Sequence, residues 1–169
     1  MGSLRKHTTT VAIIGVCAVV AYAAWAAVQI LVLNPLAAVP DAGLREIYAQ
    51  MAAAGETMPI AMPSSILAIG VGLAVTVAVV SIRRRLEPSL VAVLFLILLA
   101  LGSPAYFMAS FGPGMNLADA FGISGGDHSP GAVPLYVVSL LAAGAAVGLT
   151  VRASRRKDVA TAVSGRAAA

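Results

Sequence analysis

Four long stretches of this chain contain almost only apolar residues, and they alternate with shorter stretches that carry most of the charges. The apolar stretches cover residues 10–33, 64–82, 89–109 and 132–151. Each is close to the roughly 20 residues with which an α-helix crosses a hydrocarbon layer about 30 Å thick. The pattern therefore predicts an all-α integral membrane protein with four transmembrane helices, in one domain that covers residues 1–158.

The connections between these spans differ in length. Residues 83–88 join the second span to the third, and so short a link predicts an antiparallel helical hairpin. Two longer connections, residues 34–63 and 110–131, are expected to form loops on the outer side of the membrane. After the fourth span, residues 159–169 are small and polar and are expected to form a disordered cytoplasmic tail.

The first outer loop contains a helical pattern. Its apolar residues recur at intervals of three and four positions, and they are Leu44, Ile47, Tyr48 and Met51. Asp41 is the expected N-cap, and Gly55 is the expected C′ residue. We expect a short extracytoplasmic amphipathic helix that lies on the bilayer surface or covers the mouth of the bundle; a helix that docks a partner is the alternative.

The second outer loop has a different composition. Around residues 102–131 the chain contains no Lys or Arg and is rich in Gly, Pro and aromatic residues. Gly125-Gly126 and Ser129-Pro130-Gly131 are typical of turns, and residues 116–121 could form one helical turn. A loop of this length in a small protein is either functional or mobile, and the sequence does not decide between the two.

The basic residues predict the orientation. Of the 11 Lys and Arg residues, all but Arg45 flank the spans on one side. These flanking residues are Arg5, Lys6, Arg83, Arg84, Arg85, Arg152, Arg155, Arg156, Lys157 and Arg166. Under the positive-inside rule, both termini lie in the cytoplasm. The net charge of +4 is explained by these membrane flanks, so we expect lipid headgroups and not nucleic acid as the partner of the basic residues.

The first span has two interpretations. A basic start, an apolar run and the small residues Ala21, Ala23 and Ala24 also fit a cleaved signal peptide. The apolar run continues to Leu33, well past such a cleavage site, which favours a retained span. The high content of Ala, Gly and Val, and of Arg relative to Lys, is typical of a high-GC bacterium and points to the plasma membrane.

The interiors of the spans contain no charged residue and no His. Ion-coupled transporters need a titratable or ion-binding group near the midplane, so a transporter built on a central carboxylate is disfavoured. Small residues predict helix packing instead, at Gly70 and Ala74 in the second span and at Gly144 and Gly148 in the fourth. Packing within the chain is the simpler interpretation of these pairs, and a homodimer face is the alternative.

One group of side chains suggests a metal. The methionines other than Met1, together with His128, map to the outer side or the outer ends of the spans: Met51, Met58, Met62, Met108 and Met115. Thioether and imidazole groups are suitable ligands for Cu(I). Methionine is also a flexible residue that fills gaps in ordinary packing, which is the competing explanation. The single cysteine, Cys17, excludes an intrachain disulfide.

The sequence contains no recognisable catalytic motif, such as HExxH, GxSxG, Walker A or CxxC. We therefore expect a non-catalytic structural or accessory subunit, without a cofactor, whose outer loops contact a membrane-protein partner or lipid. A small oligomeric permease or channel is one alternative, and it would require Gln29, Thr76, Ser81 and Ser103 to face one cavity. An extracytoplasmic Cu(I)-handling protein that uses Met and His is the other.

Overall fold

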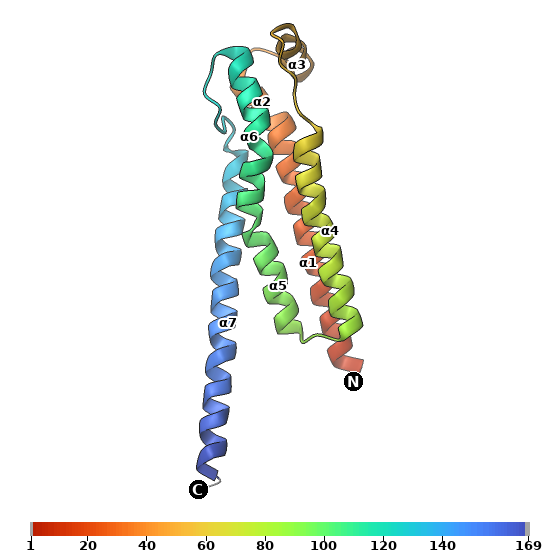
Figure 1. Ribbon diagram of the computed structural model, residues 1–169, viewed down its shortest axis with the longest axis vertical. Coiled ribbons are helices and arrows are strands. Elements are labelled where there is room, and N and C mark those ends of the chain that lie inside the picture. The colour runs from red at the N-terminus through yellow and green to blue at the C-terminus, as the bar shows by residue number, and fades with distance from the viewer. Residues whose placement is uncertain (1, 168–169) are drawn as a thin grey trace.

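A computed structural model shows an all-helical protein that contains four long apolar segments able to cross a membrane, as the sequence predicts. The structure describes the backbone of residues 2–167 and the side chains of residues 6–155. The helical elements are α1 (Gly2–Val28), η1 (Gln29–Leu33), α2 (Asn34–Ala38), α3 (Leu44–Ala53), α4 (Ala61–Arg84), α5 (Pro88–Ala100), α6 (Gly102–Phe121), η2 (Pro130–Ala132) and α7 (Val133–Ala167). Both chain ends lie at one end of the bundle, which we call the terminus end; α3 lies across the opposite end, the α3 end (Figure 1).

Small residues let the helices approach one another. α1 packs against α4 and α5, and Ala12 and Ala74 are fully buried between them. A side chain at Gly15 would collide with the ring of Phe95, so glycine at this position allows α1 and α5 to come close. Helix α1 therefore supplies part of the core.

The first span is interrupted near the α3 end. Residues Gln29–Leu33 form a π-helix, in which Asn34 N–H donates to the carbonyl of Gln29. Pro35 has no N–H to offer to the carbonyl of Leu31, four residues before it. The hydroxyl of Tyr48 on α3 donates to that carbonyl, so the irregular stretch is tied to α3.

The third span consists of two helices. It breaks at Leu101, and Pro104 lacks the N–H that would bond Ala100 in a continuous helix. At the break, Ser139 Oγ of α7 donates to the carbonyl of Leu99 (2.8 Å). The break changes the neighbours of the span: α5 packs mainly on α1 and α7, whereas α6 packs mainly on α4 and α7.

The prediction that residues 110–131 form an outer loop is wrong for most of this stretch, because more than half of it is helical. Helix α6 continues to Phe121, and only residues 122–129 connect it to η2. Pro113 and Gly114, which belong to the Gly- and Pro-rich part of the predicted loop, are buried inside this helix. They continue a buried helical stripe that includes Tyr106, Ala109 and Leu117, and the packing of this stripe outweighs the loss of one backbone hydrogen bond.

The predicted amphipathic helix is confirmed as α3, Leu44–Ala53. Ile47 and Met51 are fully buried. Gly55 is the C′ residue as predicted: its φ is +84°, and the adjacent Glu56 N–H donates to Met51 O over 2.9 Å. Asp41 is not the N-cap, because α3 begins after Gly43, which provides no side-chain cap.

Helix α7 is longer than the predicted fourth span. The structure continues it from 151 to Ala167, beyond the other helices at the terminus end (Figure 1). The predicted disordered tail, 159–169, therefore differs from the structure as far as residue 167. Ala is frequent in this stretch and favours helix. Residues 168–169 lie outside the described part of the chain.

Candidate functional site at the α3 end

The connection between α6 and α7 is held against the first span by hydrogen bonds. Trp25 Nε1 donates to Gly131 O (2.8 Å), and Gln29 Nε2 donates to Ser129 O (3.4 Å). Asn34 Oδ1 accepts from the backbone N–H of His128 (2.6 Å) and of Ser129 (3.4 Å). The three side chains come from α1, η1 and α2, so the part of the first span nearest the α3 end is hydrogen-bonded to this connection.

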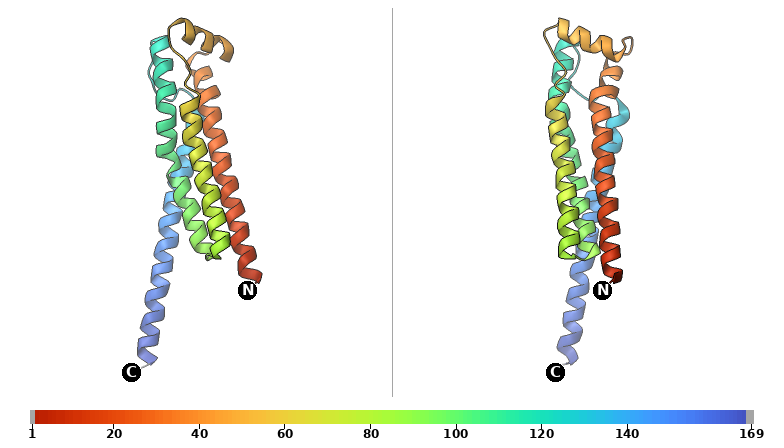
Figure 2. Two further views of the ribbon diagram at one scale, coloured as in Figure 1. Left: turned by 45° about the vertical axis from the view of Figure 1, so that its right-hand side comes forward. Right: turned by 90° about the vertical axis from the view of Figure 1, so that its right-hand side faces the viewer.

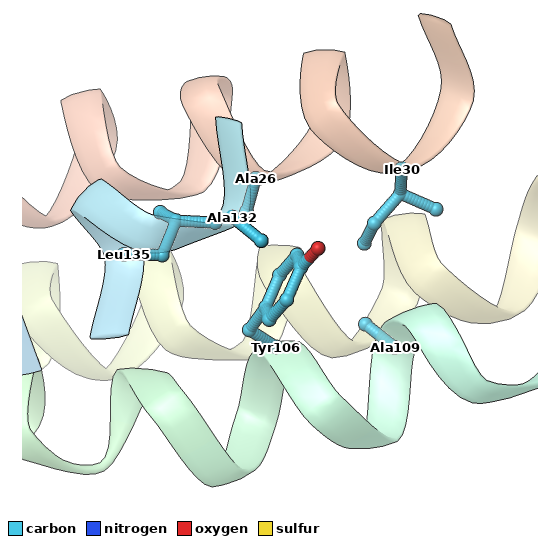
Figure 3. Packing of buried hydrophobic residues seen from close by; sticks show 6 residues of the cluster. All are labelled: Ala26, Ile30, Tyr106, Ala109, Ala132 and Leu135. Atoms are coloured by element: carbon cyan, nitrogen blue, oxygen red, sulfur yellow. The ribbon is translucent and has the colours of Figure 1, made fainter. Parts of the chain in front are cut away.

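A carboxylate joins the same connection to the other spans. Asp127 accepts from the hydroxyl of Tyr106 on α6 (2.6 Å) and, through its other oxygen, from that of Tyr136 on α7 (3.4 Å). The two tyrosine rings meet edge to face, with centroids 5.6 Å apart. Figure 3 shows Tyr106 reaching from α6 into the space between Ala26 and Ile30 of the first span and Leu135 of α7. Asp127 therefore connects the loop to two spans through buried and half-exposed aromatic groups.

Gln29 lies at the centre of this arrangement. It is fully buried, and its Oε1 has no hydrogen-bond partner among the described residues. A Cβ at Gly131 would collide with this oxygen. Only glycine therefore fits at position 131 without a shift, and the loop backbone lies directly on the Gln29 amide.

Helix α3 covers the end of α6 beside this loop. Ile47, Met51 and Leu117 form a buried cluster, and Asn116 Nδ2 donates to Thr57 O over 2.8 Å. Burial raises the pKa of the Tyr48 hydroxyl, which bonds the first span. The opposite face of α3 is exposed and polar, and it carries Arg45, Glu46 and Gln50. The α3 end therefore presents a polar surface that lies over an apolar cluster and is hydrogen-bonded to the helices below it.

No family model, no curated protein and no solved structure matches this chain. The assignment of a function therefore rests on the geometry of the chain itself. At the α3 end the polar groups bond backbone atoms of the loop and one another. This arrangement fixes the shape of a surface.

The methionines predicted as copper ligands are distributed over this end. Met51 is buried in the α3 cluster, and Met58 packs at its edge. The Sδ of Met62 lies near Gly112, that of Met115 lies near Gly125, and Met108 is exposed on α6. His128 Nε2 is paired with Ser124 O (2.8 Å). Among residues with described side chains, no group of three or more His, Cys, Asp or Glu is arranged to hold a metal.

The polar residues of the spans are well separated. Thr76 is exposed and bonds Gly72 O of its own helix, whereas Ser81 is buried near the terminus end, and its Oγ has no partner among the described residues. Gln29 lies at the α3 end, and Ser103 lies at the break between α5 and α6. Within one chain these residues therefore lie at different levels of the bundle.

The small residues that are predicted to pack helices together differ in their surroundings. Ala74 is fully buried. A Cβ at Gly70, Gly144 or Gly148 would meet no atom within 4 Å, and the last two residues are exposed. Gly144 and Gly148 of the GxxxG motif in α7 therefore lie on the outer face of the bundle, with no other described helix packed on them.

The described basic residues that flank the spans lie at the terminus end, whereas Arg45 lies on α3. Arg83 and Arg84 occupy the last turn of α4, and Arg85 follows in the left-handed conformation with a φ of +51°. Arg152 and Arg155 are exposed on α7. The side chains of Arg156 and Lys157 lie outside the described residues.

The sequence pattern does not reveal most residues of this network, namely Trp25, Asn34, Tyr106 and Tyr136. Trp25 and the tyrosines resemble ordinary aromatic residues of a membrane interface. The only local signal is a polar residue near the end of an apolar run. Gln29 lies within the last part of that run, and Asn34 directly precedes Pro35. Such a residue needs a partner, but the sequence does not identify it.

Proposed function

We propose that this chain is a non-catalytic accessory subunit of a complex in the bacterial plasma membrane, and that its α3 end is the extracytoplasmic surface that contacts a membrane-protein partner. The observation that carries the proposal is the attachment of residues 122–132 to the first span through Trp25, Gln29 and Asn34. A surface that is ordered before binding loses little conformational entropy when a partner docks. A merely mobile loop would not need these bonds.

The chemistry of this surface suits a polar partner region. Arg45, Glu46 and Gln50 are exposed on α3, and Ser124 and Asp127 are exposed on the neighbouring loop. Gln50 Nε2 donates to Glu46 Oε1 over 3.2 Å, one turn earlier on the same helix. Charged groups of both signs favour a protein surface over a uniformly anionic lipid surface.

Site-specific photo-crosslinking in native membranes tests the proposal. A benzophenone side chain at Gln50 or at Ser124 should give one dominant adduct with another membrane protein. The same group at Leu140, which lies on the lipid-exposed face of α7, is the matched control and should not give that adduct. Asn34→Ala should reduce the adduct at Ser124, because it frees the loop from the first span.

Other outcomes would contradict the accessory-subunit proposal. Adducts that contain only a second copy of this chain would support a homo-oligomer and bring the permease or channel alternative forward. Equal labelling from Gln50 and Leu140 would show that the α3 end has no dedicated partner.

The orientation is tested separately. In a Cys17→Ser background, a cysteine at Gln50 should react in intact cells with a maleimide that cannot cross the membrane. A cysteine at Ser154 should react only after the cells are opened. The reverse pattern would place the α3 end in the cytoplasm and contradict the predicted orientation.

A further inference from the structure

An apolar cavity of about 220 Å³ lies between α1, α4 and the junction of α5 and α6. It is larger than an engineered protein cavity of about 150 Å³ that stays dry and binds benzene. Small residues from three helices line it: Ala23, Gly70 and Gly102. The lining also includes Tyr22 and Leu98. The cavity is therefore large enough for an apolar group and is built from several elements.

The cavity lies where the third span changes its neighbours. The break at Leu101 redirects the span from α1 toward α4, and small residues at this level leave the space unfilled. A Cβ at Gly102 would lie 2.7 Å from Cζ of Tyr22, so glycine is needed for the phenol to lie under the junction. The Tyr22 hydroxyl points to Ser139 Oγ on α7 (3.2 Å).

The cavity is continuous with the lipid-facing surface. Ile69, Leu73 and Leu101 line it and are 63%, 50% and 56% exposed. Leu73 is ten residues from Arg83, or about 15 Å along α4, which is close to the middle of a hydrocarbon layer about 30 Å thick. Ile66, at the other end of the lining, is about 10 Å closer to the α3 end. The cavity therefore opens into the lipid leaflet on the α3 side.

We propose that this cavity binds one acyl chain of a phospholipid from that leaflet. Lipid tails surround the opening and are as apolar as the lining, so the binding energy comes from packing and not from the hydrophobic effect. An unfilled space would lose the dispersion contacts of its lining. Water is a poor occupant because it needs two to four polar partners, and the hydroxyl of Tyr22 already pairs with Ser139.

Photo-crosslinking with a modified lipid tests the proposal on the unmodified protein. The protein is reconstituted in phosphatidylcholine vesicles that contain a small fraction of phosphatidylcholine with a diazirine at the middle of one acyl chain. Adducts mapped by mass spectrometry should concentrate several-fold in residues 66–73 and 98–105, relative to the exposed Leu140 and Leu141 of α7. Labelling no higher than at Leu140 and Leu141 would show ordinary boundary lipid and overturn the proposal.

Two glycines of α4 provide matched variants. An added Cβ meets no atom within 4 Å at either Gly70 or Gly72, but only Gly70 lines the cavity. Gly70→Leu should fill the cavity and abolish the concentration of adducts, whereas Gly72→Leu should leave it unchanged. Equal effects of the two variants would contradict the proposal. If Gly70→Leu does not fold, the adduct map of the unmodified protein still decides. The proposal is independent of the partner assigned to the α3 end.

Discussion

The two ends of the bundle terminate their helices differently. At the α3 end, the left-handed residues that follow α3 and α6 are glycines, Gly55 (φ +84°) and Gly122 (φ +64°). At the terminus end, the corresponding residue after α4 is Arg85 (φ +51°). A left-handed conformation costs a side-chain-bearing residue about 1–2 kcal/mol. At the α3 end glycine therefore adopts the left-handed conformation without steric cost, whereas at the terminus end a side-chain-bearing residue adopts it at a cost.

The two ends also differ in the hydrogen bonds that join their helices and loops. At the α3 end, side chains of the first span bond the α6–α7 connection through Trp25, Gln29 and Asn34. At the terminus end, Thr8 Oγ1 bonds Leu86 O (2.9 Å), and α7 extends past the other helices (Figure 2). The bonds at the α3 end hold a connecting loop in place, which predicts slow backbone exchange there.

The largest effect is expected from a substitution that separates the loop from the first span. Gly131→Ala places a Cβ against Oε1 of the buried Gln29 and should lower the free energy of unfolding by about 2–3 kcal/mol. Unfolding in mixed micelles by added SDS measures this change. Gly126→Ala is the control, since a Cβ there meets no atom within 4 Å. Equal stability of both variants would show that the loop does not rest on Gln29.

A smaller effect is expected from loss of the amide of Asn34. Asn34→Ala removes the acceptor of two backbone N–H groups, which should cost about 1–3 kcal/mol. The same SDS titration applies. Asn116→Ala removes a side-chain donor to Thr57 O and should cost less, because no backbone N–H loses its acceptor. A larger loss in the Asn116 variant would contradict the assigned role of Asn34.

The terminus end offers a stabilising substitution. Arg85→Gly should raise the free energy of unfolding by about 1 kcal/mol, because glycine adopts the left-handed conformation without steric cost. Arg84→Gly, which lies in the last turn of α4, should instead lower it by about 0.5–1 kcal/mol. If both variants lose stability equally, the turn at Arg85 is not strained.

The smallest effect concerns the bond between α3 and the first span. Tyr48→Phe removes the hydroxyl that bonds Leu31 O and should cost about 0.5–1 kcal/mol at neutral pH. Because burial raises the pKa of Tyr48, its contribution is complete below the unfolded pKa of about 10 and is lost as pH rises through the higher folded pKa. Stability measured from pH 8 to 11 should therefore fall more for the wild type than for Tyr48→Phe. Identical pH profiles would show that the hydroxyl is not buried.

The helical architecture could be predicted from the sequence because it depends on patterns within one segment. Apolar runs of sufficient length predicted the four spans, and the spacing of Ile47 and Met51 predicted α3. The extent of α6 was missed because Gly and Pro residues, among them Pro113 and Gly114, suggest a loop locally. Their place in a buried stripe becomes evident only once α6 packs on α4 and α7.

The candidate site could not be predicted because its bonds join distant parts of the chain. Asn34 is 94 residues from His128, and Trp25 is 106 residues from Gly131. Each of these residues has an ordinary explanation when considered alone. The break at Leu101 was also missed, because Pro104 lies within a predicted apolar span and its effect depends on Ser139 of another helix.

Hydrogen–deuterium exchange of the wild type and Asn34→Ala, followed by mass spectrometry of residues 122–131, is the most direct test of a pre-ordered α3 end. We predict that this segment exchanges slowly in the wild type, and that Asn34→Ala accelerates it without changing exchange in α5. Fast exchange in the wild type, equal to that of the variant, would show a mobile loop and contradict the proposed docking surface.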